Sequence, residues 1–127
     1  MTVLERFLKY ISYDTQSDDY SGLHPSTPKQ KLLGAELAAE LSRMGLLDVR
    51  MDEFGYVYGW LPATPGCEEA PCMGLIAHMD TAPSFSGANV KARILRYEGG
   101  DIEQSPGIVM RAAEHESLKQ YIGQELI

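Results

Sequence analysis

Apolar residues recur with helical spacing close to the start of the chain. The pattern comprises Val3, Leu4, Phe7, Leu8 and Ile11, which share one face of a 3.6-residue period. We therefore predict a helix that ends near Tyr13-Asp14. The polar stretch that follows, residues 14–27, has the composition of turns and little to bury, so we predict a loop there.

A second helix is predicted directly after this loop. Ser26-Thr27-Pro28 combines a capping hydroxyl with a proline suited to the first helical position. Gly45 fits the residue just past the helix end, where a left-handed backbone is favoured. The expected apolar stripe of this helix consists of Leu33, Leu37, Leu41 and Met44.

The pattern then changes from helical spacing to short β-like runs. Residues 47–52 and 56–61 are predicted strands, joined by a hairpin turn at Phe54-Gly55. A connection rich in proline, glycine and glutamate leads to residues 72–77, which form a continuous apolar run. Such a run is typical of a strand that is buried on both faces, in a sheet covered by helices.

The last third of the chain has weaker signals. We predict a loop over residues 80–88, a strand over residues 92–97 and a weakly helical stretch over residues 114–122 that ends at Gly123. The chain ends on Leu126-Ile127, as expected for a polypeptide cut at the start of another strand; a true terminus that docks its last side chains is the alternative. Turns are predicted at Gly99-Gly100-Asp101 and Ser105-Pro106-Gly107.

Composition narrows the class of protein. The chain has 127 residues, enough for about one domain, with 11 Lys and Arg against 18 Asp and Glu and a net charge of −7. An acidic chain without a basic cluster argues against nucleic-acid binding. No apolar run approaches a membrane span, and charged residues interrupt the N-terminus, so we expect neither a membrane segment nor a signal peptide. A cytoplasmic protein with Cys67 and Cys72 as reduced thiols is expected; a disulfide between them is the alternative.

The sharpest chemical feature is His78-Met79-Asp80 at the end of the predicted buried strand. Residues i and i+2 of an extended chain point to the same face, so the imidazole and the carboxylate should lie side by side. Imidazole is a common zinc ligand, and a metal-bound histidine usually gives its second nitrogen to an oxygen partner, a role that suits Asp80. A strand-end histidine bonded to a turn aspartate, without a functional role, explains the spacing equally well.

The other candidate ligands add little to this pair. His24 lies in the polar loop, His115 is expected at the surface at a helix start, and Glu68-Glu69 is a solvated acidic pair. No phosphate-binding glycine loop and no Gly-x-Ser-x-Gly nucleophile motif is present. A catalytic metal would therefore need further ligands from elsewhere.

Seven stretches have a distinctive sequence: residues 4–10, 14–17, 25–27, 44–46, 76–83, 86–90 and 97–102. In this order and at this spacing they resemble the N-terminal part of the peptidase T family of tripeptide aminopeptidases. The resemblance runs along nearly all 127 residues and is more specific than the His-x-Asp motif alone.

This resemblance implies a two-zinc exopeptidase whose α/β/α catalytic domain is only partly contained in residues 1–127. It implies that His78 binds one zinc and that Asp80 is the catalytic carboxylate that orients His78. The remaining ligands and the general-base glutamate of the family would lie beyond Ile127, so we expect negligible activity and weak metal binding in this chain alone. A non-catalytic binding domain that retains the scaffold is the alternative. An incomplete sheet also predicts self-association of the chain.

Overall fold

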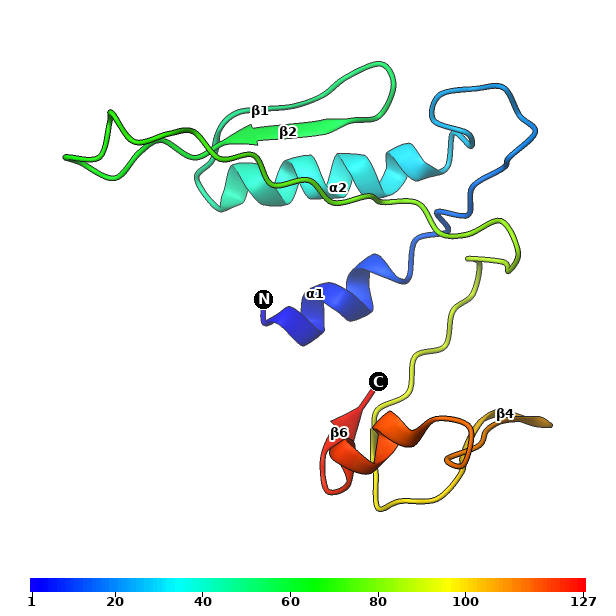
Figure 1. Cartoon of the computed structure of the whole chain (residues 1–127). Helices are drawn as coiled ribbons and strands as arrows, with labels where there is room; N and C mark the ends of the chain where they lie inside the picture. Colours follow the sequence, from blue (N-terminus) through cyan, green and yellow to red (C-terminus); the bar gives the residue numbers. More distant parts are fainter. The chain divides into compact units, whose positions relative to one another are not determined.

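The computed structural model describes all 127 residues, which form two units, Met1–Val90 and Lys91–Ile127. Helices and small antiparallel sheets make up the chain, so the predicted α/β class is confirmed (Figure 1). The expected three-layer α/β/α arrangement is not seen, because each sheet has only two strands. Neither helix has both the length and the apolar character needed to cross a bilayer.

The first helix, α1 (Val3–Tyr10), matches the predicted start and ends a few residues early. It begins with a capping box: the hydroxyl of Thr2 accepts a hydrogen bond from the Glu5 amide at 3.2 Å. The Glu5 carboxylate accepts one from the Thr2 amide at 2.6 Å in return. These bonds satisfy two amide groups that a helix start leaves without partners.

The second helix, α2 (Gln30–Arg43), ends as predicted but begins differently. Lys29 precedes it without a side-chain cap, so the predicted hydroxyl cap is wrong. Ser26 and Thr27 instead receive hydrogen bonds from the side chain of Gln30, because the chain makes a turn before the helix starts. At the other end Gly45 has φ +88°, the left-handed conformation expected of the residue past a helix end.

Charged and polar side chains hold α1 against α2. Glu40 of α2 is only 3% exposed, and its carboxylate accepts a hydrogen bond from the Tyr10 hydroxyl at 2.8 Å and pairs with Arg6. Lys9 and Arg43 both pair with Glu36, one turn earlier on α2. Three polar side chains of α1 therefore contact two glutamates of α2.

The predicted hairpin forms and packs on α2. Strand β1 (Leu47–Met51) pairs in antiparallel fashion with β2 (Val57–Trp60), within a residue of the predicted bounds. The carboxylate of Asp52 closes the turn by accepting hydrogen bonds from the amides of Phe54 and Tyr56 at 3.0 and 2.9 Å. Figure 1 shows the hairpin lying along α2.

The predicted buried strand at residues 72–77 is wrong. This stretch is extended but is not part of a sheet, and it is exposed throughout, with Ile76 at 99%. In Figure 1 it is a plain tube after β2, without a strand arrow. Burial on both faces requires strands on either side and helices above and below, and unit Met1–Val90 offers neither to this stretch.

Unit Lys91–Ile127 contains two short antiparallel pairs. Strand β3 (Leu95–Arg96) pairs with β6 (Glu125–Leu126), so the predicted strand near residues 92–97 is shorter than expected. The pattern did not reveal the second pair, β4 (Ile102–Ser105) with β5 (Ile108–Met110), although its turn at residues 105–107 was predicted. The weakly helical stretch is a 3₁₀ helix, Glu116–Tyr121, labelled η1.

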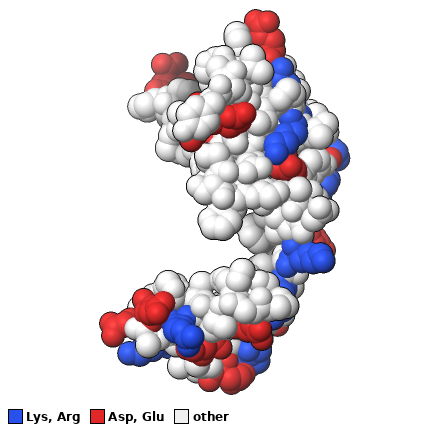
Figure 2. All heavy atoms as spheres, turned by 90° about the vertical axis from the view of Figure 1, so that its right-hand side faces the viewer, with Lys and Arg blue, Asp and Glu red and all other residues white.

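Very few apolar side chains are buried. The buried ones are Leu33, Tyr97 and Leu118, whose exposed fractions are 6%, 4% and 8%. The predicted stripe of α2 is only partly covered, since Leu33 is buried whereas Met44 remains 56% exposed. Figure 2 shows charges of both signs scattered between broad uncharged areas on the face that it presents.

Candidate functional site

The structure brings together the two side chains of the His-x-Asp motif. Nδ1 of His78 lies 3.1 Å from Oδ1 of Asp80, a hydrogen-bond distance. The side chain of His78 is 84% exposed and that of Asp80 is 44% exposed, so the pair faces solvent at the end of the extended stretch. Because Nδ1 is engaged by Asp80, Nε2 is the ring nitrogen that remains available to a ligand.

Residues 15–17 fix the backbone immediately after this pair. The amide of Thr81 donates to the carbonyl of Thr15 at 3.1 Å, and the amide of Ser17 donates to the carbonyl of Thr81 at 2.9 Å. These bonds form a short parallel bridge between Gln16 and Thr81. Thr15 is 3% exposed, so the anchoring end of the bridge is buried.

A second set of contacts surrounds this bridge. Asp14 accepts hydrogen bonds from the Gln16 amide at 3.1 Å and from Lys29 Nζ at 2.8 Å. The Lys29 contact is the main cause that lowers the pKa of Asp14 below its ordinary value, so the carboxylate is ionised at neutral pH. Gly87 approaches closely from the loop that follows Thr81, and a Cβ there would lie 2.8 Å from Oδ1 of Asp14.

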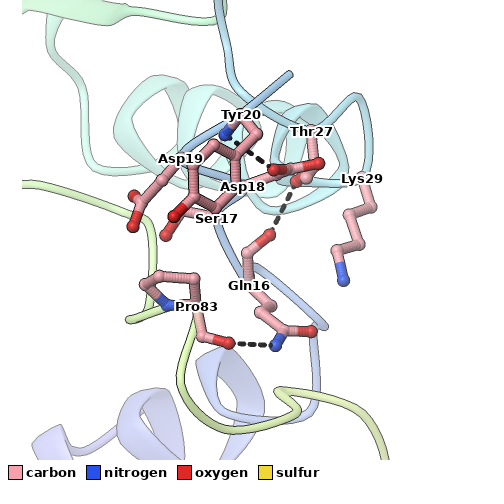
Figure 3. Close-up of a pocket in the computed structure, with 8 residues that line it drawn as sticks. All are labelled: Gln16, Ser17, Asp18, Asp19, Tyr20, Thr27, Lys29 and Pro83. Atoms are coloured by element: carbon pink, nitrogen blue, oxygen red, sulfur yellow. Dashed lines mark hydrogen bonds between the residues drawn. The ribbon is translucent and has the colours of Figure 1, made fainter.

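A polar pocket of about 450 Å³ lies beside the bridge (Figure 3). In it, the side-chain amide of Gln16 donates to the carbonyl of Pro83 at 2.8 Å, and the hydroxyl of Thr27 donates to the carbonyl of Gln16 at 2.8 Å. The loop predicted over residues 14–27 is therefore an ordered support for the segment that carries His78 and Asp80. The pocket is lined by Gln16, Ser17, Asp18, Asp19, Tyr20, Thr27, Lys29 and Pro83.

A larger cleft of about 1030 Å³ has the motif on its wall. Its apolar part comes from α2, from the hairpin and from the extended stretch, including Leu41, Val57 and Leu75. His24 is exposed in the loop, as predicted, and it also lines this cleft together with His78. Sequence spacing could not have shown this, because the two histidines are separated by both an entire helix and a hairpin.

The other candidate residues are exposed. His115 is exposed and directly precedes η1 in the unit Lys91–Ile127, as predicted for a surface residue at a helix start. Glu68 and Glu69 are exposed, and Cys67 and Cys72 are exposed free thiols. Within the unit Met1–Val90, neither the two glutamates nor the two cysteines form a metal-binding group with His78 and Asp80.

The donor set suits part of a metal centre. An imidazole oriented by a carboxylate is the arrangement found around catalytic zinc. The chain gathers no group of three or more His, Cys, Asp or Glu side chains that could hold a metal ion. The residues present therefore fit one ligand and its orienting partner, and not a complete site.

The sequence is closely similar to known proteins, although no family model matches it. Peptidase T of Parabacteroides distasonis is 43% identical over 129 residues, covering 100% of this chain and 32% of its own length. Peptidase T of Desulfitobacterium hafniense is 48% identical over 129 residues, covering 99% of the chain and 31% of its own length. That of Clostridium novyi is 45% identical over 128 residues, with 98% and 31% covered.

These relatives are all named as peptidases, and the similarity extends over essentially the whole of this chain. The chain is similar to peptidase T along its whole length, which confirms the resemblance seen in the motifs. The chain spans about a third of the length of these relatives, as expected of an N-terminal portion.

Proposed function

We propose that this chain supplies His78 and Asp80 to the zinc centre of an aminopeptidase that removes the N-terminal residue of tripeptides. The observation that supports it is the 3.1 Å contact between the two side chains within a sequence related throughout to peptidase T. The acidic chain, without a cation cluster, suits a peptidase better than a nucleic-acid binder. We also propose a cytoplasmic location.

In this proposal His78 binds zinc through Nε2, and Asp80 holds the ring through Nδ1. A carboxylate in that position fixes the tautomer and increases the basicity of the ligating nitrogen. A zinc ion held there would act as a Lewis acid toward the peptide carbonyl. The chain's own task is then to orient one ligand, through the bridge between residues 15–17 and Thr81.

The remaining ligands and the general base belong, in this proposal, to polypeptide outside these 127 residues. Two facts support this division. The chain brings together fewer than three metal-binding side chains, and it spans about a third of its relatives. The same polypeptide would complete the three-layer α/β/α domain. We therefore expect weak zinc binding and no measurable peptide turnover from the chain alone.

The test uses a longer protein that carries this sequence and has the length of its relatives. His78→Ala should reduce bound zinc and tripeptide turnover together, and Asp80→Asn should reduce both by about 10- to 100-fold. His115→Ala is the matched control, because His115 is exposed and directly precedes η1 in the other unit. Unchanged zinc content and turnover in His78→Ala would overturn the assignment.

A non-catalytic binding domain on the same scaffold is the second candidate. The exposed, two-donor set supports it, since such a pair alone holds a metal weakly. The longer protein separates the two candidates: a binding domain would show no tripeptide turnover at any zinc concentration, whatever residue stands at position 78.

A further inference from the structure

Asp14 connects three segments of the unit Met1–Val90. Its Oδ1 accepts a hydrogen bond from the Gln16 amide at 3.1 Å, and its Oδ2 accepts one from Lys29 Nζ at 2.8 Å, directly before α2. Gly87 packs against the same carboxylate, because a Cβ there would lie 2.8 Å from Oδ1 of Asp14. A single partly buried side chain thus joins the loop that begins at residue 14, the start of α2 and the loop that follows the His-x-Asp motif.

Asp14 completes the hydrogen bonding of the bridge between Gln16 and Thr81. In a parallel pair, the residues before and after the bridging residue bond to the partner, and the bridging residue's own groups point away from it. Thr15 and Ser17 accordingly bond to Thr81. The amide of Gln16 instead donates to Asp14. Asp14 therefore satisfies a backbone donor that the bridge leaves without a partner, and it holds this stretch in the shape that pairs with Thr81.

We infer that Asp14 is a positioning residue for the His78–Asp80 pair, an inference that rests on the proposed function. Both oxygens of Asp14 are already bonded, so it acts through the backbone and not as a ligand. Asp14 holds the backbone that pairs with Thr81, and Thr81 is covalently joined to Asp80. Asp80 in turn lies 3.1 Å from Nδ1 of His78 and orients its ring.

Small displacements matter at such a pair. Loss of the partner that orients a metal ligand typically weakens metal binding by about 10- to 100-fold. A displacement of about 1 Å at a catalytic group can reduce a rate by about 100-fold. The bridge lies one residue after Asp80, so loosening it lets this carboxylate move relative to the ring of His78. Asp14 acts one step further from the ring than Asp80 does, so its loss should have a smaller effect than the loss of Asp80.

Hydrogen exchange in the 127-residue chain tests the hold on the bridge and needs no metal. Asp14→Ala should make the amides of Ser17 and Thr81 exchange about tenfold faster, because both charge-assisted bonds of the carboxylate are lost. Asp14→Asn should have a smaller effect, since its side-chain oxygen still provides an acceptor. The Asp52 amide, which bonds within the hairpin turn, should keep its rate and so exclude general unfolding as the cause. An unchanged rate at Thr81 would overturn the inference.

A protein of the relatives' length that carries this sequence tests the effect on the site. Asp14→Ala should raise the zinc dissociation constant, measured by competition with a chromogenic chelator, about threefold to tenfold. It should lower kcat for a tripeptide by a similar factor and leave KM within about twofold, because a positioning residue does not bind the substrate. Asp14→Asn should restore most of both losses. Glu36→Gln is the matched control, since it removes a lysine-paired carboxylate of the same unit, and both quantities should stay unchanged.

Equal effects of Asp14→Ala and Glu36→Gln on zinc binding would overturn the inference, as would a rise in KM without a fall in kcat. Failure of the proposed function has a different signature: in the longer protein, His78→Ala would leave bound zinc and tripeptide turnover unchanged. The exchange rates of the 127-residue chain would then still show whether Asp14 holds Thr81.

Discussion

The carbonyl of Thr81 accepts two hydrogen bonds from Ser17, one from the amide at 2.9 Å and one from the hydroxyl at 2.8 Å. The two residues are 64 positions apart, and Thr81 directly follows Asp80. Hydrogen bonds from a turn-rich loop near the start of the chain therefore fix the backbone at the residue that directly follows the His78–Asp80 pair. This makes residues 14–17 part of the support of the site.

Ser17→Ala tests this support. The change removes the hydroxyl bond and leaves the amide bond, so the free energy of unfolding should fall by about 0.5–1 kcal/mol. Urea unfolding followed by the fluorescence of Trp60, the single tryptophan, measures this in the unit that contains the bridge. Exchange of the Thr81 amide should become faster as well. Ser21→Ala is the control, since its hydroxyl contacts only its own loop, and an equal effect there would contradict the argument.

Glu40 provides a second prediction, about the contact of the two helices. Glu40→Gln weakens the bonds to Arg6 and Tyr10, so the melting temperature should fall by several degrees. Glu36→Gln, on the same helix, should have a smaller effect because the Glu36 side chain is more exposed than that of Glu40. Thermal unfolding by circular dichroism compares the two variants. An equal fall in melting temperature in both variants would mean that the burial of Glu40 does not strengthen its contribution to stability.

The Glu40→Gln variant also predicts a pH dependence. The hydrogen bond from the Tyr10 hydroxyl lowers the pKa of Glu40 below its ordinary value of 4.5, and Arg6 lowers it to a smaller extent. A carboxyl group whose pKa is lowered by folding stabilises the protein above its unfolded pKa, and this stability is lost as the pH falls through the folded value. The difference in melting temperature between the original chain and Glu40→Gln should therefore be constant from neutral pH to about 5 and should shrink below 4.5. A difference that grows on acidification would contradict the assignment.

Local patterns predicted local structure well. The period of α1, the glycine that ends α2 and the aromatic and β-branched runs of the hairpin were all confirmed, because each depends on residues within a few positions. The contact of His78 with Asp80 follows from the same kind of reasoning, since their spacing alone places them on one side of an extended chain.

Contacts between distant residues were not predictable. The apolar run at residues 72–77 indicated a buried strand, yet burial depends on partner strands that composition does not reveal. The bridge from Thr15 and Ser17 to Thr81 joins a polar loop to a segment more than sixty residues away, and no periodic signal connects them. The place of His24 on the cleft wall was missed for the same reason.

Close packing between α2 and the hairpin gives a fourth prediction. A Cβ on Gly34 would lie 2.7 Å from the sulfur of Met51 and 3.5 Å from the side chain of Val57. Gly34→Val should therefore destabilise the chain by about 1–3 kcal/mol, measured by urea unfolding. Gly34→Ala should be much milder, because the end of the methionine side chain can move aside and alanine favours the helix. Adding Met51→Ala to Gly34→Val should recover part of the loss, and no recovery would argue against this contact.

The end of α2 gives the fifth prediction, which separates backbone conformation from packing. Gly45 has φ +88° and a Cβ there would meet no atom within 4 Å, so only the backbone restricts substitution. The carbonyls of Leu41 and Ser42 depend on this conformation, since the amides of Leu46 and Gly45 bond to them at 3.1 Å. Gly45→Ala should lower the free energy of unfolding by about 1 kcal/mol, and Gly45→Asn should cost less, because asparagine tolerates the left-handed region. Urea unfolding monitored at Trp60 ranks the three proteins, and an alanine variant as stable as the original would show that the helix can end without the left-handed residue.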